Sequence, residues 1–300
     1  MNKIVVIGSL NIDLVVNVED FPKPGETITS LDYKEIPGGK GANQAVAASK
    51  LNANVAMIGK VGTDGHGDIL LDNLKKHGVD TSYIKREDTT GKAIINVNTE
   101  GENNIVFVPG ANYKVSKQDI DDNMELIEES EMLILQMEIP MPVIEYALEI
   151  GKKLNKKIIF NPAPAQKIDM DLLKHVHTLI PNEPELEILT GMPVESKEQI
   201  EEAAQTLIEL GINQVIVTIG SKGSLIVTKD EVTHVPALKV EVKDTTAAGD
   251  SFVGAYSSKL IEGYSAKEAV EFATKVAALT VTKEGAQSSL PTLEEVENAF

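Results

Sequence analysis

The sequence predicts an α/β fold: a three-layer α/β/α sandwich with a mostly parallel central sheet and a small β-sheet lid. Two observations predict it. Short apolar runs alternate with amphipathic helical stretches along most of the 300 residues, and two extended segments without helices interrupt that alternation. Alternation of this kind implies a parallel sheet with helices on both faces. We expect a single domain over residues 1–300, since this length allows one large domain.

The strands of the large sheet are predicted from apolar runs of about five residues, which are typical of strands buried on both faces. These runs are 3–8, 55–60, 132–136, 157–161, 215–219 and 224–228. Helices between them carry start signals, because a Ser or Thr followed three residues later by Gln or Glu fits the capping box. The pairs are Ser196 with Gln199, Ser265 with Glu268, and Thr292 with Glu295.

The two interrupting segments are approximately 12–37 and 90–108. The first is extended and punctuated by Pro and Gly, and the second alternates apolar and polar residues around a turn at 100–102, which is a hairpin signature. Together they are expected to form a small antiparallel sheet, the lid. One face of so small a sheet needs cover from a substrate cleft, another subunit or both, and we expect a homodimer through the lid.

Composition excludes several classes of function. The chain has 28 basic and 46 acidic residues, a net charge of −18, which argues against nucleic acid and anionic membranes as partners. It contains no cysteine, so disulfides, thiolate nucleophiles and cysteine-bound metals are excluded. The first apolar run is too short to span a membrane, is interrupted by Asn11 and Asp13, and precedes no cleavage site. We expect a cytoplasmic protein.

A glycine-rich motif occupies residues 38–45, where two glycines, Lys40 and a third glycine lead into a helix predicted over 42–51. Glycines let a ligand approach the backbone closely, and the helix start is expected to offer free N–H groups. Lys40 and Asn43 are the polar side chains placed to use that opening. The alternative is a tight turn into a helix that packs closely through its alanines.

A second motif, residues 244–250, precedes apolar residues that recur at helical spacing over 252–260, so a helix is predicted to begin near Gly249. The small residues before it leave the amides of 247–250 uncovered, which makes an anion hole at the positive end of a helix. Asp250 lies at the mouth of this hole. Its carboxylate is either the N-cap of the helix or a base for a substrate hydroxyl.

Polar or glycine clusters follow five predicted strands, at Gly8, Glu138, Asn161, 182–185 and 220–223. Ligands of parallel α/β sheets bind outside the carboxyl ends of the strands. One such cluster is more often a loop than a site, but five on one edge indicate a site. No phosphate-binding P-loop motif is present. The histidines at 175 and 177 have no metal-binding context and indicate a surface or strand-edge role.

With GGKGANQA at 38–45 and DTTAAGD at 244–250, the chain resembles the ribokinase-like carbohydrate kinase family. NIDLV near the start, PNEPE, TIGSKG and KEGAQSS follow in the family's order, so the resemblance covers nearly the full chain. It implies a large α/β domain with a β-sheet lid. The implied activity is ATP-dependent phosphorylation of the 5-hydroxyl of D-ribose, giving D-ribose 5-phosphate and ADP.

The resemblance also implies roles for single residues. The sugar would be held by Asn11, Asp13, Gly39, Lys40, Asn43, Glu138 and Asp250, with Asp250 as catalytic base. The anion hole would consist of the amides of Ala247, Ala248, Gly249 and Asp250. ATP would be bound by Asn182, Thr218, Gly220, Ser221, Lys222, Gly223, Gly249, Asp250 and Thr274. Glu185 would act on Mg²⁺ through water, and K⁺ would be held by Asp244, Thr246, Thr280, Lys283, Gly285 and Ser289, several through backbone carbonyls.

Two alternatives stay open at this point. The same scaffold can phosphorylate another sugar, such as fructose or deoxyribose. The chain can also be a non-catalytic binding protein that responds to a sugar or nucleotide, but such a protein would have lost the base or the anion hole, and both are present here. The low aromatic content, 4% with no Trp, gives few platforms for stacking a nucleoside and favours a free pentose.

Overall fold

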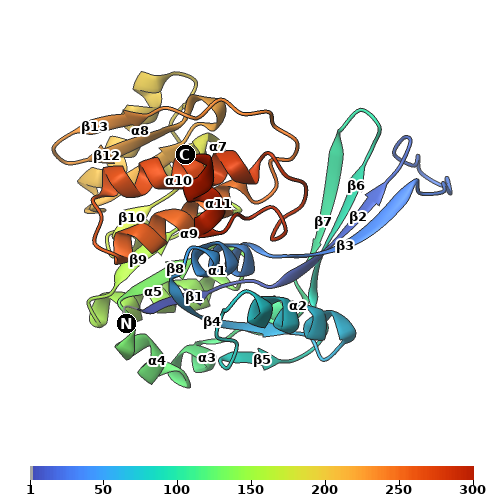
Figure 1. Cartoon of the computed structure of the whole chain (residues 1–300). Helices are drawn as coiled ribbons and strands as arrows, with labels where there is room; N and C mark the ends of the chain where they lie inside the picture. Colours follow the sequence, from blue (N-terminus) through green and yellow to red (C-terminus); the bar gives the residue numbers. More distant parts are fainter. Residues whose placement is uncertain (1–2) are drawn as a thin grey trace.

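The computed structural model describes residues 3–300 and confirms the three-layer α/β/α architecture (Figure 1). Its large sheet has nine strands, and the pairings between β11 and β5 are all parallel, whereas β12 and β13 are antiparallel. In spatial order the strands are β13 (Val232–Val235), β12 (Ser224–Thr228), β11 (Gln214–Thr218), β10 (Thr178–Leu179), β9 (Lys157–Phe160), β8 (Met132–Leu135), β1 (Lys3–Ile7), β4 (Asn54–Val61) and β5 (Ile84–Arg86).

Helices cover both faces of this sheet (Figure 1). They are α1 (Lys40–Lys50), α2 (Gly65–Lys76), α3 (Lys117–Asp121), α4 (Met124–Glu129), α5 (Met141–Lys153), α6 (Met170–Leu173), α7 (Glu183–Thr190), α8 (Lys197–Glu209), α9 (Ala248–Ile261), α10 (Ala266–Thr280) and α11 (Leu293–Ala299), with short 3₁₀ turns η1 (Gly110–Lys114) and η2 (Gly220–Lys222). The three predicted capping boxes are confirmed at the starts of α8, α10 and α11. In residues 3–300 we find no helix both long and apolar enough to cross a bilayer.

The sheet separates two hydrophobic cores, and β1 shows why. Successive side chains of a strand point to opposite faces. Ile4 and Val6 pack with α1, α9 and α10 on one side, whereas Val5 and Ile7 pack with α5 and α8 on the other, and all four are fully buried. A continuous apolar run is therefore what the central strand of such a sheet requires.

A second sheet of four strands, the lid, projects from the body (Figure 1). Its order is β3 (Asp32–Gly38), β2 (Asn11–Asn17), β6 (Gly91–Val97) and β7 (Asn103–Val108). The predicted hairpin is present as β6 and β7, with Gly101 at φ 82° in its turn. The expectation of a wholly antiparallel sheet is wrong, since β2 and β6 pair in parallel. Each comes from a separate insertion, and both leave the body in the same direction.

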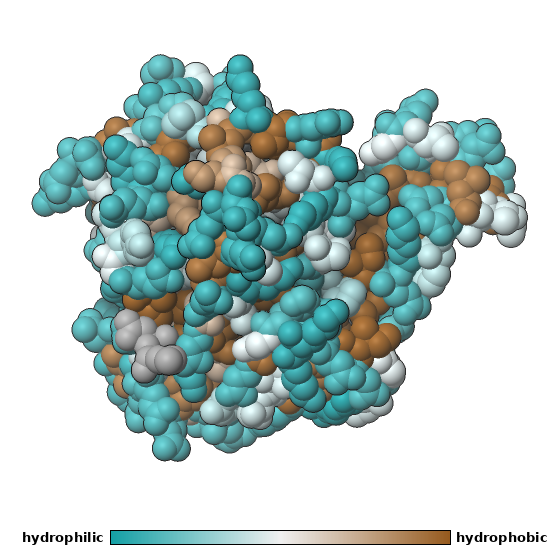
Figure 2. Space-filling view, in the orientation of Figure 1, coloured by the Kyte–Doolittle hydropathy of each residue, from teal (hydrophilic) through white to brown (hydrophobic). Residues whose placement is uncertain are grey.

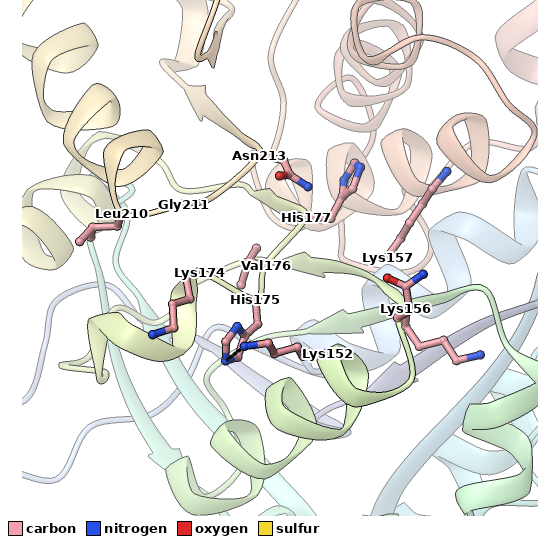
Figure 3. Close-up of a pocket in the computed structure, with 11 residues that line it drawn as sticks. Lys152, Lys156, Lys157, Lys174, His175, Val176, His177, Leu210, Gly211 and Asn213 are labelled. Atoms are coloured by element: carbon pink, nitrogen blue, oxygen red, sulfur yellow. Dashed lines mark hydrogen bonds between the residues drawn. The ribbon is translucent and has the colours of Figure 1, made fainter.

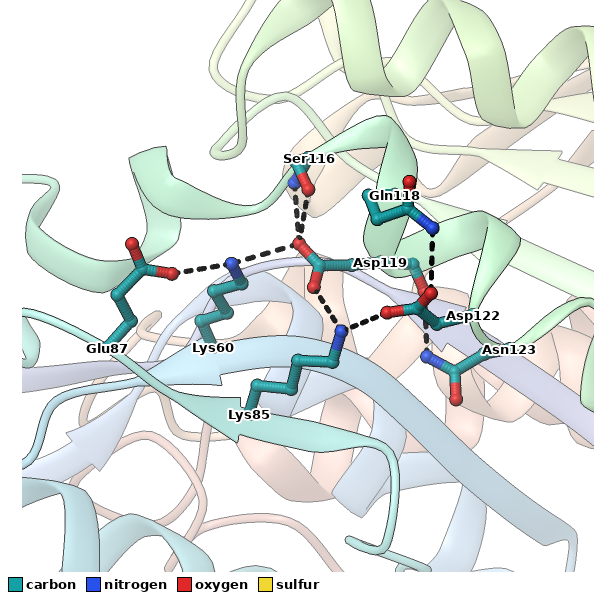
Figure 4. Close-up of polar contacts among 8 residues, drawn as sticks. All are labelled: Lys60, Lys85, Glu87, Ser116, Gln118, Asp119, Asp122 and Asn123. Atoms are coloured by element: carbon teal, nitrogen blue, oxygen red, sulfur yellow. Dashed lines mark hydrogen bonds and ion pairs between the residues drawn. The ribbon is translucent and has the colours of Figure 1, made fainter.

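A charged network stabilises the edge of the large sheet that is formed by β4 and β5 (Figure 4). Lys60 on β4 is 6% exposed, and its Nζ contacts Glu87 at 2.7 Å and Asp119 of α3 at 3.0 Å. Lys85 on β5 reaches the other oxygen of Asp119 at 2.9 Å. Burial alone would raise the pKa of Asp119, but hydrogen bonds from Lys85, Ser116 and Lys60 outweigh it and lower the pKa to about 2. The network satisfies a buried lysine and ties α3 to the sheet edge.

Candidate active site

A cavity of about 210 Å³ lies at the carboxyl edge of the large sheet. The ends of β9, β10 and β11 and the starts of α1, α7 and α9 form its wall. The lining residues are Lys40, Asn161, Ala163, Ile180, Asn182, Glu185, Thr218, Thr245, Ala247, Ala248, Gly249, Asp250 and Val253. Residues that were predicted from three separate motifs therefore meet in one place, as the rule for parallel sheets requires.

Asp250 lies in the first turn of α9 and is 6% exposed. The N-cap position belongs to Ala247, so the reading of Asp250 as the helix cap is wrong. Its carboxylate accepts two hydrogen bonds from α1, with 2.9 Å from Asn43 Nδ2 to Oδ2 and 2.9 Å from Gln44 Nε2 to Oδ1. A buried carboxylate held this way and lining a cavity suits a general base.

The start of α9 presents backbone amides to the same cavity. Ala247 has the left-handed φ of 60°, and the amide of Ala248 donates to Thr245 O at 3.2 Å. The amides of Ala247, Gly249 and Asp250 have no acceptor within residues 3–300. The 14-residue helix adds the positive end of its dipole, so the arrangement attracts an anion.

The start of α1 differs from the prediction. Lys40 N donates to Glu138 Oε2 at 3.1 Å, Gly41 N to Ser9 Oγ at 3.3 Å, and Ala42 N to Ser9 O at 2.9 Å. The expectation of free N–H groups here is wrong, because the chain after β1 passes directly beneath the helix. A Cβ on Gly41 would lie 2.6 Å from Ser9 N, so this glycine serves close packing of two backbones.

Lys40 is the cation of the site. Burial alone would lower its pKa, but the negative charges of Asp250, Glu138, Glu185 and Asp13 raise it above the ordinary value on balance. Lys40 therefore stays charged, and it partly offsets the carboxylates gathered around the cavity.

Two carboxylates on the lid side of the site are hard to ionise. Burial, followed by the charges of Glu138 and Asp250, raises the pKa of Asp13 to about 7. Burial also raises the pKa of Glu138, although hydrogen bonds from Ser9 and the Lys40 amide oppose it. Perturbed carboxylates of this kind are typical of functional sites.

The predicted sugar-binding side chains lie together where the lid joins the body. Glu138 Oε2 accepts hydrogen bonds from Ser9 Oγ at 2.5 Å and Asn11 Nδ2 at 3.5 Å. Asn112 Nδ2 in turn donates to Asn11 Oδ1 at 2.7 Å. Neither Ser9 nor Asn112 was identified from the sequence. Ser9 lies two residues after the end of β1 and next to the predicted strand-end residue Gly8, but no local pattern distinguishes Asn112.

The predicted nucleotide residues divide into two groups. Asn182, Thr218, Gly249 and Asp250 line the cavity, as does Glu185, which was predicted for Mg²⁺. Residues 220–223 form η2 and its C-cap after β11 and are not among the lining residues. Asn182 and Glu185 form a capping box for α7, with 2.8 and 2.9 Å between side chain and backbone. Thr274 does not line the cavity, because it lies within α10 with its hydroxyl donating to Val270 O.

The segments predicted to hold a monovalent cation also meet. Lys243 N donates to Val281 O at 2.8 Å, and Gly285 N donates to Asp244 Oδ2 at 2.8 Å. Asp244 Oδ1 accepts from Thr246, so its carboxylate joins the loop before α9 to the loop after α10. The hydroxyls of Thr280 and Ser289 donate to carbonyls within their own segments.

A larger hollow of about 570 Å³ lies at the amino edge of the sheet and holds none of the predicted site residues (Figure 3). Four lysines and two histidines line it, among them Lys152, Lys174, His175 and His177. The helices α5, α6 and α8 end here, and helix C-termini attract cations. Burial, then Lys152, lowers the pKa of His175, and burial lowers that of His177. Their position supports the strand-edge reading.

Comparison with known proteins identifies the family. The model of the pfkB family of carbohydrate kinases matches residues 1–293. The ribokinase of Staphylococcus aureus is 40% identical over 299 residues, covering 98% of each chain. The deoxyribokinase of Salmonella typhi is 41% identical over 295 residues, covering 97% of this chain and 96% of its own.

A solved structure supports the same family assignment and shows the same fold. The ribokinase of Arabidopsis thaliana complexed with ribose and ATP superimposes with a TM-score of 0.93 at 35% identity, covering 99% of this chain and 98% of its own. Family, fold and lid therefore agree across sequence and structure.

Proposed function

Because the chain belongs to the pfkB family of carbohydrate kinases, we propose that it transfers the γ-phosphoryl group of ATP to the 5-hydroxyl of D-ribose. The products are D-ribose 5-phosphate and ADP. The observation that carries the proposal is the pairing, in one cavity, of the Asp250 carboxylate with the unpartnered amides at the start of α9. The S. aureus relative named ribokinase and the neighbour solved with ribose and ATP support ribose as the acceptor.

The chemistry follows from these groups. Phosphoryl transfer needs positioning and charge stabilisation more than covalent help. Asp250 receives the proton of the 5-hydroxyl as the new O–P bond forms and the bond from the γ-phosphorus to ADP breaks. The unpartnered amides of 247, 249 and 250 stabilise the charge on the transferring group. Asn11, Asp13, Gly39, Lys40, Asn43 and Glu138 hold the sugar, whose hydroxyls match carboxylates and amides.

A divalent metal accompanies ATP in such kinases, and we propose Mg²⁺ near Glu185. Among residues 3–300 no group of three or more His, Cys, Asp or Glu forms a metal cage. This fits Mg²⁺, which usually keeps its waters and binds through one or two carboxylates and substrate phosphates. Glu185 lines the cavity beside Asn182. The metal would neutralise phosphate charge, together with Lys40 and Lys222.

We propose K⁺ at the junction of the loops 244–246 and 280–289. The proposed ligands offer the Asp244 carboxylate, hydroxyls and backbone carbonyls, which are oxygen donors suited to a hard monovalent cation. Asp244 is held by Thr246 and Gly285, so the cation would brace the loop that leads into α9. The proposed ligands are Asp244, Thr246, Thr280, Lys283, Gly285 and Ser289, several through carbonyls.

The lid suits a homodimer interface. Of the 16 large apolar residues that are exposed in the described range 3–300, seven lie in the lid segments: Ile28, Leu31, Tyr33 and 105–108. Figure 2 shows apolar surface along the projecting sheet. The β7 residues point alternately to the two faces of the sheet, so packing one face against a second lid would remove part of this apolar surface from water. A cytoplasmic location, where ATP is available, stays a prediction.

The decisive test of the base is Asp250→Asn, which keeps the shape of the side chain and still accepts one hydrogen bond. We expect kcat for ribose to fall by at least about a thousandfold, while ribose still binds in calorimetry. Near wild-type turnover would refute Asp250 as base. Binding of ribose and ATP by the wild-type protein without any turnover would instead favour a non-catalytic binding protein.

The acceptor is a separate question, because a relative named deoxyribokinase is as similar as one named ribokinase. We propose ribose as the main substrate and 2-deoxyribose as the second candidate. Comparing kcat/KM for ribose, 2-deoxyribose and fructose, with Mg²⁺ and K⁺ each present or omitted, decides between them. A higher value for either other sugar would overturn ribose, and undiminished rates without K⁺ would overturn the cation site.

A further inference from the structure

Buried side-chain amides surround the carboxylate of Asp250. Gln44 is fully buried and Asn43 is 5% exposed, and each donates to a different oxygen of Asp250 at 2.9 Å. They are consecutive residues of α1, so one rigid helix positions both donors. With an N–H group on each oxygen, the carboxylate has a single favoured rotation about its Cβ–Cγ bond.

The orientation of Gln44 is itself fixed by two neighbours. Its Oε1 accepts a hydrogen bond from Gln136 Nε2 at 2.7 Å, and its Nε2 donates to Asn161 Oδ1 at 3.1 Å as well as to Asp250. Because its oxygen is occupied by a donor, Gln44 must present its nitrogen to the carboxylate. Gln136 follows β8 and Asn161 follows β9, so the ends of two sheet strands hold the amide.

Asn43 is fixed from the opposite side. Gln287 is 2% exposed, and its Nε2 donates to Asn43 Oδ1 at 3.0 Å. Gln287 Oε1 accepts from Asn73 Nδ2 on α2. The segment after α10, which also bonds Asp244 through Gly285, therefore reaches Asp250 through one intervening amide.

This arrangement costs stability. Gln136 Oε1 is buried and has no hydrogen-bond partner among residues 3–300. An orphaned buried acceptor is unfavourable, and an apolar residue at 136 would avoid it. Because its other end orients Gln44, the Gln136 side chain points to a role at the site instead of in the core.

We propose that Gln44 and Gln287 are positioning residues for phosphoryl transfer, Gln44 by direct contact with Asp250 and Gln287 through Asn43. The inference rests on the proposed function, in which Asp250 is the base. Neither residue lines the cavity, so both act behind the carboxylate and not on the substrates. Their N–H donors hold the carboxylate in one orientation and direct its remaining lone pairs to the sugar hydroxyl.

The test is the pH profile of kcat for Gln44→Met, which keeps the side-chain volume and removes the donor. We expect kcat to fall about tenfold to a hundredfold, the effect of one hydrogen bond to a charged group. The acid limb moves to higher pH, because the charged base has lost a donor. KM for ribose stays within about twofold. Gln44→Glu moves the limb further, and Gln287→Met gives a smaller loss of about three- to tenfold.

Gln214→Met is the matched control. Gln214 is a glutamine 6% exposed at the amino end of β11, donating to Thr178 Oγ1 at 2.8 Å. We expect it to lower the melting temperature and leave the pH profile unchanged.

An unshifted profile in Gln44→Met, or an equal shift in the control, overturns the proposal. If Gln44→Met does not fold, the profiles of Gln44→Glu and Gln287→Met decide in the same way. The activity of Asp250→Asn tests the base separately. Failure of the proposed base can therefore be distinguished from failure of the proposed positioning role of Gln44 and Gln287.

Discussion

The two glycine-containing helix starts at the site, those of α1 and α9, look alike in sequence and differ in structure. The first amides of α1 are satisfied by Ser9 and Glu138, whereas those of α9 at 247, 249 and 250 have no acceptor in the described chain. Accordingly, α1 is bound to the body and presents side chains, while α9 presents backbone N–H groups. A glycine in the first turn of a helix therefore allows another group to approach the backbone closely, and only the tertiary neighbours decide whether that group is backbone or ligand.

The charges of the two starts differ as well. The carboxylates of Asp13 and Glu138 gather at α1, and their pKa values are raised by burial. At α9 the positive end of the dipole faces the cavity. The neutral sugar belongs on the first side and the phosphates on the second. Three substitutions test this division.

The largest effect is expected for Gly41→Ala at the start of α1. The new Cβ would lie 2.6 Å from Ser9 N and 2.8 Å from the carbonyl carbon of Gly8, and backbone atoms cannot move aside as a side chain can. We expect a loss of about 3 kcal/mol in the free energy of unfolding. Chemical denaturation measures it. A loss below about 0.5 kcal/mol would show that the helix is not held by its backbone contact.

Gly249→Ala at the start of α9 should lower activity and leave stability intact, the opposite of Gly41→Ala. No atom lies within 4 Å of the added Cβ, and Gly249 lines the cavity, so the methyl group would stand where we place the transferring phosphate. We expect kcat/KM for ATP to fall about tenfold to a hundredfold, with the free energy of unfolding unchanged or raised by up to about 1 kcal/mol. Wild-type kinetics in this variant would contradict the anion hole.

The smallest effect is expected for Asp13→Asn, which removes one of the carboxylates near the start of α1. The pKa of Asp13 is about 7 in the folded protein and about 3.9 in an unfolded chain, so this group favours the folded state below pH 4 and loses that contribution as pH rises through 7. Asp13→Asn cannot ionise. The melting temperature of the variant should match that of the wild type near pH 4 and exceed it at pH 8. The expected gain in the free energy of unfolding at pH 8 is about 1–2 kcal/mol, a value already lowered to allow for the partial exposure of the side chain.

The same variant should bind ribose more weakly, because a neutral amide replaces a carboxylate acceptor. Calorimetry with ribose at pH 8 measures this loss. If the stability difference between the two proteins does not change from pH 4 to pH 8, the carboxylate is not desolvated and the contrast between the two helix starts is weaker than described.

The sequence alone determined most strands of the central sheet, the starts of three helices and two side chains that line the cavity. Apolar runs identify β1, β4, β8, β9, β11 and β12, and three capping boxes mark α8, α10 and α11. These features depend on contacts within a few residues or on burial of a whole strand, so local pattern carries them. The local motifs at 38–45 and 244–250 likewise pointed to Lys40 and Asp250, and both line the same cavity.

Only the tertiary structure decided what each group touches. Ser9, Gln44, Asn112 and Gln287 reach the site across 32 to 249 residues of sequence. The extremes are the hydrogen bond that Gly41 N donates to Ser9 Oγ and the one that Gln287 Nε2 donates to Gly38 O. No local periodicity encodes such separations. Likewise, the parallel pairing of β2 with β6 depends on where two insertions leave the body. Two similar helix starts acquired different tasks because different chain segments lie beneath them, and that is a property of packing in three dimensions.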